Sequence, residues 1–217
     1  SRAADVFAKA ATSSNTTVEM LGETMKYAAP IAHTFGMSLE EVSALAGMMA
    51  NAGIKGSQAG TALRASLLRM SKPTTDMQKT MTELGISFTD ANGNMKKTGD
   101  IVRMLEKSFT GLSESQRLEA AQTLFGTEAA SAWLGILDQG ADTYESFAEQ
   151  LNNAKGAADE MAKTRLDNLA GDLEEMGGAL ETAKLEIMDK LNPYLREGVQ
   201  WLTTKIPAIQ EKIEQLI

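Results

Sequence analysis

The sequence predicts a mainly α-helical protein, and three observations support this fold class. Apolar residues recur at spacings of three and four along most of the 217 residues. Helix start signals and glycine stop signals alternate along the chain. Only one short stretch, 86–96, has the features of a β-hairpin. We therefore expect a multi-helix body with one small β-hairpin over residues 1–156, followed by a long heptad-patterned helical segment over residues 157–217.

The first half of the body is expected to contain five helices. Ser38 and Glu41 form a capping box that starts the third helix, and Gly53 suits its left-handed end. Pro30 should kink or split the second helix because proline lacks the backbone N–H. The apolar periodicity places the five helices at residues 6–11, 17–35, 38–53, 57–70 and 75–84.

The second half of the body begins with the predicted hairpin. Ile86–Phe88 is compatible with a strand, and Asp90–Gly93 is a tight-turn signal before Asn94–Lys96. Ser113 with Gln116 and Asp142 with Glu145 are two further capping boxes. Four helices are expected here, at residues 98–109, 113–126, 127–140 and 142–155.

The segment after Gly156 has a different pattern. No proline occurs between residues 157 and 191, so one helix of that length is possible, with breaks expected near 192 and 204. Apolar residues recur here at alternating steps of four and three, and this pattern places them in one stripe along the helix, a heptad seam. Such a seam must be covered by another helix. The seam folds back onto the body or pairs with other chains, and the sequence leaves both open. Its apolar residues are Ala162, Leu166, Leu169, Leu173, Met176, Leu180, Ala183 and Ile187.

Composition and charge exclude several classes of function. Residues 1–137 hold 13 acidic and 13 basic side chains, whereas residues 138–217 hold 16 and 8, so the net charge of −8 lies in the last third. This balance argues against nucleic acid as a partner. The absence of cysteine excludes disulfides, thiol catalysis and cysteine-ligated zinc. The single histidine argues against most catalytic triads. No apolar run has the length of a membrane span, there is no signal peptide, and both ends resemble cuts in a longer polypeptide.

The glycine-rich stretch 53–61 is the first candidate for chemistry. It resembles a phosphate-binding loop, but Lys55 precedes Gly56 and a helix precedes the stretch, whereas a P-loop needs a strand there. We interpret it as a sharp corner that lets the next helix approach its neighbour closely. The spacing of Asp90, Asn92 and Asn94 resembles a calcium loop, yet the glycine position is wrong and the glutamate is missing. We expect no catalytic residue, cofactor or metal site.

Two sets of residues are candidates for interactions. Residues 42–75 contain no acidic side chain, so the cations in this stretch are expected to dock on an acidic surface, with the last third of the chain as the candidate. The second set belongs to the heptad seam. The candidate interaction residues are Lys55, Arg64, Arg69, Lys72, Leu166, Leu169, Leu173, Met176, Leu180 and Ile187.

Several motifs resemble one known family. Gly36–Val42 followed by Ala50–Arg64 is similar to the shared core region of the tape measure proteins of long-tailed bacteriophages. The likeness ends near Leu191–Pro193, so it spans most of the chain. Between these motifs it continues through Leu84–Ile86, Asp90–Met95, Leu124–Gly126, Ala154–Ala158 and Asn168–Leu169.

The resemblance implies a structural role. Tape measure proteins occupy the lumen of the tail tube in the virion, help to set tail length, and leave the tube before or with the genome at infection. It also implies assembly in the host cytoplasm, with tail tube proteins, tail-tip or baseplate proteins and tail assembly chaperones as partners. Together with the seam, it predicts a homo-oligomer with no specific nucleic acid and no catalysis. The alternative functions are a cytoplasmic helical adaptor and an enzyme of phosphate chemistry at the glycine-rich corner.

Overall fold

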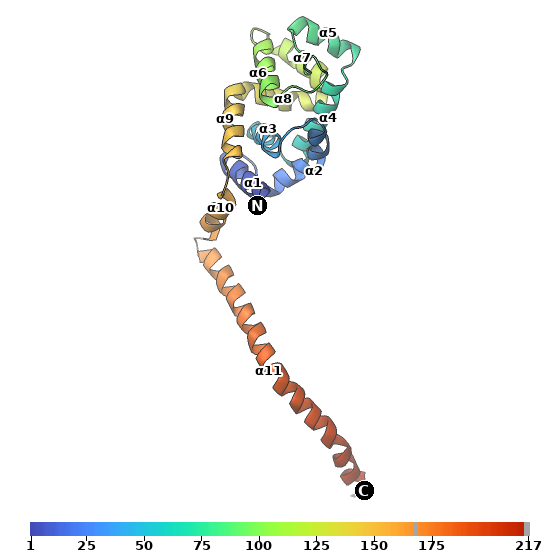
Figure 1. Cartoon of the computed structure of the whole chain (residues 1–217), viewed down its shortest axis with the longest axis vertical. Coiled ribbons are helices and arrows are strands. Elements are labelled where there is room, and N and C mark those ends of the chain that lie inside the picture. Colours follow the sequence, from blue (N-terminus) through green and yellow to red (C-terminus); the bar gives the residue numbers. More distant parts are fainter. Residues whose placement is uncertain (167–168, 215–217) are drawn as a thin grey trace. The chain divides into compact units, whose positions relative to one another are not determined.

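The computed structural model describes residues 1–166 and 169–214 (Figure 1). This part of the chain is helical and contains no strand, which confirms the mainly α-helical character but not the small β-hairpin. Its helices are α1 (Arg2–Ser13), α2 (Val18–Thr34), α3 (Leu39–Asn51), α4 (Gly56–Ser71), α5 (Thr75–Leu84), α6 (Thr98–Phe109), α7 (Glu114–Phe125), α8 (Thr127–Gln139), α9 (Ala141–Asn152), α10 (Ala157–Leu166) and α11 (Leu169–Glu214).

The chain divides into two compact units, residues 1–162 and 163–217. The first unit, called the body below, holds α1 to α9 and the start of α10. The second holds the rest of α10 and α11. The division expected at residue 157 lies near this boundary and stays a prediction.

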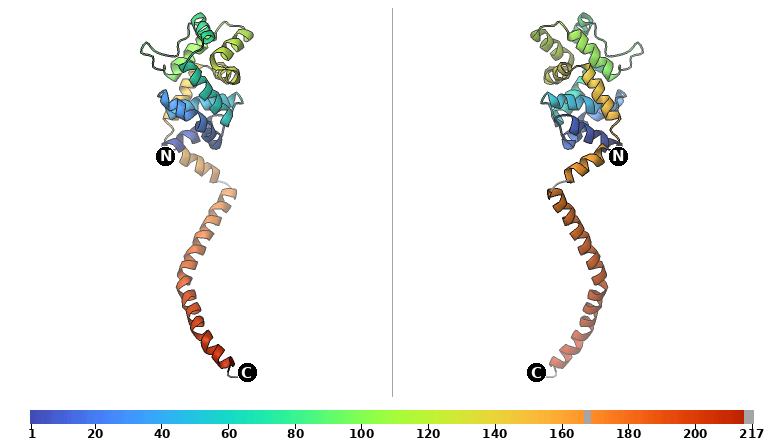
Figure 2. Two further views of the ribbon diagram at one scale, coloured as in Figure 1. Left: turned by 90° about the vertical axis from the view of Figure 1, so that its right-hand side faces the viewer. Right: turned by 90° about the vertical axis from the view of Figure 1, so that its left-hand side faces the viewer.

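Helix α3 forms the centre of the body. It packs against α1, α2, α4, α8 and α9, and Figures 1 and 2 show it enclosed among them. Ten of its 13 residues are buried, from Glu40 to Ala50. Small residues make this possible, since a Cβ on Gly47 would lie 2.4 Å from the Phe147 ring of α9. A Cβ on Gly135 of α8 would lie equally close to Ala52.

An aromatic cluster anchors the other half of the body. The rings of Phe125 and Trp133 stack at 4.6 Å, and Phe88 meets Phe125 edge-on at 6.4 Å. The indole N–H of Trp133 donates to the hydroxyl of Ser66 at 2.7 Å. Ser66 in turn donates to the carbonyl of Ala62, so the indole N–H of Trp133 and the hydroxyl of Ser66 both have hydrogen-bond partners. The cluster thereby joins α4, α7 and α8 to the loop before α6.

The predicted start signals are confirmed at two helices and wrong at a third. Ser38 with Glu41 and Ser113 with Gln116 form complete capping boxes. Asp142 and Glu145 form none, because α9 already begins at Ala141 and both carboxylates pair with Arg103 of α6. Pro30 lies inside α2, which is not split.

The predicted β-hairpin is wrong. Residues 86–96 form a turn with one isolated bridge between Thr89 and Met95. Two backbone hydrogen bonds, from Lys96 to Phe88 and from Asp90 to Asn94, close the turn. Pairing does not extend beyond this one bridge before helix α6 begins at Thr98.

Helix α11 is one gently curved element of 46 residues (Figure 2). It passes through Asn192 and Thr204, where the sequence suggested breaks. Pro193 does not end the helix. The single helix expected over 157–191 instead corresponds to α10 and α11, with residues 167 and 168 outside the described part.

Candidate interaction surfaces

The glycine-rich stretch 53–61 forms the predicted corner between α3 and α4. Gly53 and Gly56 adopt positive φ of 89° and 57°, a backbone conformation that favours glycine. The hydroxyl of Thr24 on α2 donates to the carbonyl of Gly56 at 2.9 Å. A Cβ on Gly60 would lie 2.6 Å from the backbone oxygen of Thr24. The glycines therefore allow α4 to lie directly against α2.

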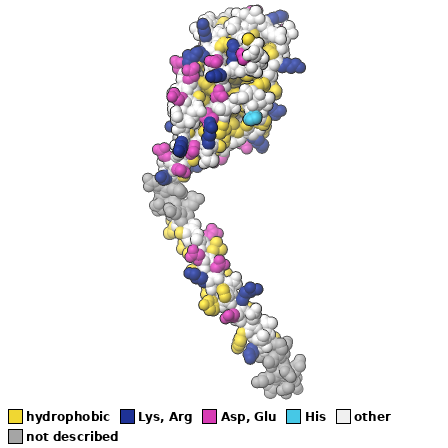
Figure 3. All heavy atoms as spheres, in the orientation of Figure 1, with side chains coloured by type: hydrophobic (Ala, Val, Ile, Leu, Met, Phe, Trp, Pro, Cys, Tyr) yellow, Lys and Arg dark blue, Asp and Glu magenta, His cyan; other side chains and the backbone are white. Residues whose placement is uncertain are grey.

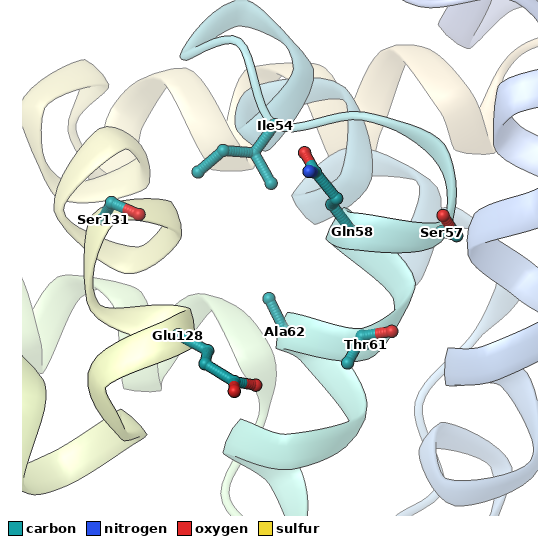
Figure 4. Close-up of a pocket in the computed structure, with 7 residues that line it drawn as sticks. All are labelled: Ile54, Ser57, Gln58, Thr61, Ala62, Glu128 and Ser131. Carbon is teal, nitrogen blue, oxygen red and sulfur yellow. The ribbon is translucent and has the colours of Figure 1, made fainter.

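An open groove of about 400 Å³ adjoins this corner (Figure 4). Figure 4 shows the groove between the start of α4 and α8, with Glu128 and Ser131 on the α8 side. Its lining includes one carboxylate and no cation, which is the wrong charge for holding a phosphate group. The lining residues are Ile54, Ser57, Gln58, Thr61, Ala62, Glu128 and Ser131.

The calcium-like spacing at Asp90 makes a turn. One carboxylate oxygen of Asp90 accepts hydrogen bonds from the backbone N–H groups of Asn92 and Asn94 at 2.8 and 2.9 Å. The hydrogen bond from Asn94 is the main reason that the pKa of Asp90 lies below its ordinary value. The carboxylate is thus used to hold its own loop, as an Asx turn does.

The four candidate cations are spread along α4. Lys55 precedes the helix and Lys72 follows it, so they lie about 26 Å apart at 1.5 Å per residue. Arg64 and Lys72 are exposed. The structure therefore separates the two ends of the stretch and leaves Arg64 and Lys72 accessible near its second half.

Arg69 has a role inside the body that the sequence did not reveal. Its guanidinium donates to the carbonyls of Thr123 and Leu124 at 2.8 and 3.4 Å. These carbonyls belong to the last turn of α7, where cations are favoured by the helix dipole. Arg69 thus fastens α4 to the end of α7 beside Gly126.

The apolar residues of α11 are exposed along the described helix (Figure 3). Leu180 is 63% exposed, and large side chains further along the helix, such as Trp201, are exposed as well. The side chains of Leu166 and Leu169 lie outside the described residues. The heptad arrangement of this face stays a prediction, with Leu173, Met176, Leu180 and Ile187 as its exposed members.

A partly buried ion pair joins α1 to α3, and sequence reasoning missed it. Arg2 donates to one carboxylate oxygen of Glu40 at 2.7 Å. Burial of Glu40 opposes ionisation, but the hydrogen bond and charge of Arg2, together with hydrogen bonds from the Glu40 backbone and from Ser38, outweigh it. The pKa of Glu40 therefore lies below its ordinary value. The second oxygen is buried without a partner among the described groups. A separation of 38 residues gives no periodic signal by which the sequence could reveal this pair.

A buried tyrosine is another group that the sequence did not single out. Burial raises the pKa of the Tyr144 hydroxyl, and the negative charge of Glu41 adds to this effect. Tyr144 belongs to α9 and its ring lies close to Gly99 of α6. The neutral phenol therefore serves the packing of α6 and α9.

We searched the described residues for metal-binding clusters and for membrane-spanning helices. Among them, no group of three or more His, Cys, Asp or Glu side chains is arranged to hold a metal ion. None of the described helices is long and apolar enough to cross a membrane.

Comparison with known proteins gives one family. A family model described as phage-related minor tail protein matches residues 1–126, which include α1 to α7. No solved structure gives a significant match.

Two relatives match nearly the whole chain. A protein named tape measure protein, from Pneumococcus phage Dp-1, is 45% identical over 205 residues, which are 94% of this chain and 18% of the relative. A probable tape measure protein from Escherichia phage P2 is 31% identical over 199 residues, which are 90% of this chain and 24% of the relative. The chain thus spans about a fifth of the length of these relatives. Both matches are longer than the body, so the similarity extends into the second unit.

Proposed function

Since the chain belongs to the family of phage-related minor tail proteins, we propose that it is a core segment of a tape measure protein and helps to set tail length. In this role it occupies the lumen of the tail tube in the virion, after assembly in the host cytoplasm. Its partners are the tail tube, the tail-tip or baseplate proteins and the tail assembly chaperones. The names of both relatives support this assignment.

The observation that carries the proposal is the length of α11. A continuous helix of 46 residues spans about 69 Å at 1.5 Å per residue. Because this rise is fixed by backbone hydrogen bonds, the extent of such a helix depends on residue number alone. That property is what a molecular ruler requires.

The exposed apolar face of α11 supports self-association. Large apolar side chains on one helix lose contact with water when a second helix covers them. We propose that copies of the chain pair through this face and form a homo-oligomer. In this proposal the chain acts through assembly contacts and catalyses no reaction.

A deletion in the parent phage protein tests the ruler. Removing four heptads, residues 174–201, preserves the heptad register and should shorten tails by about 42 Å at 1.5 Å per residue. Tail length is measured on electron micrographs of assembled phage. A length-preserving control replaces Gly177 and Gly178 by alanine and should leave tails unchanged. Tails of normal length after the deletion would contradict the proposed function.

A further inference from the structure

One face of α4 carries an exposed leucine between two cations. Arg64, Leu68 and Lys72 follow one another at intervals of four residues, which places them along one side of the helix. Leu68 is 46% exposed, although most apolar residues of α4 are buried. Lys72 is the first residue after the helix. These three residues are called the α4 ladder below.

Helix α11 carries the same arrangement with opposite charge. Glu181, Leu185 and Asp189 also follow one another at intervals of four residues, and all three are exposed. Leu185 is 64% exposed. It lies about 140° around the helix from Leu180 and about 160° from Ile187, at 100° per residue. These three residues, called the α11 ladder below, therefore lie off the heptad seam.

We propose that the α4 ladder of one copy docks on the α11 ladder of a second copy. Each ladder spans about 12 Å at 1.5 Å per residue, so the two leucines meet between two pairs of opposite charge. The order cation, leucine, cation is symmetric, and so is the order acid, leucine, acid. Two antiparallel or two parallel helices can therefore form the same three contacts.

The charges around both ladders favour a second copy of the chain as the partner. Residues 42–75 hold four cations and no acidic side chain, whereas residues 172–189 hold six acidic side chains and one lysine. Among the described residues, none of the four charged ladder groups has an ion-pair partner. A phosphate polymer would satisfy the cations, but it would leave the exposed leucine between them uncovered. The contact leaves the seam free, so it adds a second interface to the proposed assembly.

Charge reversal in the full chain tests the proposal. The double variant Arg64→Glu and Lys72→Glu turns both attractive pairs into repulsive ones and should weaken self-association about tenfold or more. The matched control, Lys79→Glu and Lys107→Glu, makes the same change in net charge at exposed positions of α5 and α6. Sedimentation equilibrium gives the association constants, and far-UV circular dichroism checks that each variant is folded.

A complementary variant separates the two possible interfaces. A chain with Glu181→Lys and Asp189→Lys should associate weakly with itself, yet mixing it with the α4-ladder variant should restore the wild-type association constant. High salt should weaken the wild-type assembly as well, because it screens exposed pairs.

Equal association of the α4-ladder variant and its control would overturn the proposal, since the seam alone would then hold the copies together. A strictly monomeric wild-type chain would overturn it too. Neither result bears on the tail-length test.

Discussion

The body and α11 bury their apolar residues to very different extents. Trp133 of the body is 1% exposed and stacks on Phe125, whereas Trp201 of α11 is 61% exposed. The body thus gains its hydrophobic stabilisation within one chain. Helix α11 has no comparable contacts among the described residues.

This difference implies two kinds of stability. Isolated helices are marginal in water, because nucleation is costly and propensity alone contributes little. Helix α11 should therefore depend on association, and its helicity should rise with protein concentration. The body should unfold in a transition that does not depend on concentration. The two tryptophans report on the two regions separately.

The largest expected effect is the loss of a core ring. Phe125→Ala should destabilise the body by about 3–5 kcal/mol, because the cavity forfeits its contacts with Phe88 and Trp133. The measurement is urea unfolding followed by the fluorescence of Trp133, in a Trp201→Phe background.

A matched truncation in the other region sharpens the comparison. Leu180→Ala removes an exposed side chain and should leave the unfolding of the body unchanged, while it weakens self-association. If Leu180→Ala lowered the stability of the body as much as Phe125→Ala does, the two regions would not be independent.

Two glycine substitutions should have opposite signs. Gly60→Ala places a Cβ 2.6 Å from the carbonyl oxygen of Thr24, so α2 and α4 must move apart. The expected cost is about 1–3 kcal/mol in the unfolding of the body. Gly177→Ala meets no atom within 4 Å and should stabilise α11 by up to about 1 kcal/mol.

Thermal unfolding of the body and the helicity of α11 at low concentration check these signs. A neutral Gly60→Ala would show that α2 and α4 do not need to lie this close. Lower helicity in Gly177→Ala would show that the glycine has a role in α11 beyond flexibility.

Local signals in the sequence predicted much of the fold. Helix periods, the capping boxes at Ser38 and Ser113 and the glycine corner at 53–56 depend on residues that are close in sequence. The turn at residues 90–95 was located correctly, but a bridge was taken for a hairpin, because the sequence pattern does not show how far two segments will pair.

Contacts between distant residues could not be predicted. Arg69 was taken as a docking cation, yet it caps α7 more than 50 residues away. The fate of the apolar face of α11 could not be predicted either, because apolar spacing along a helix does not show what covers it. The α4 ladder was only partly visible, since Leu68 reads as one more core residue until its exposure is known.

The smallest expected effect concerns the ion pair of Arg2 and Glu40. The pKa of Glu40 in the folded body is lowered, so its ionised form contributes stability above the carboxyl pKa of the unfolded chain. That contribution is lost as the pH falls through the folded pKa, below the ordinary value. Arg2 is 76% exposed, which screens the pair and keeps the effect small.

The stability difference between Glu40→Gln and the wild type should therefore depend on pH. At pH 7 the variant should be less stable, because Arg2 loses its anionic partner, and the difference should shrink as the pH approaches 3. Urea midpoints of the body at several pH values measure this, and Glu119→Gln on the exposed side of α7 is the matched control. A constant difference between Glu40→Gln and the wild type at all pH values would mean that the side chain acts through packing alone. A difference that shrinks would show that α1 is held on the central helix partly by charge.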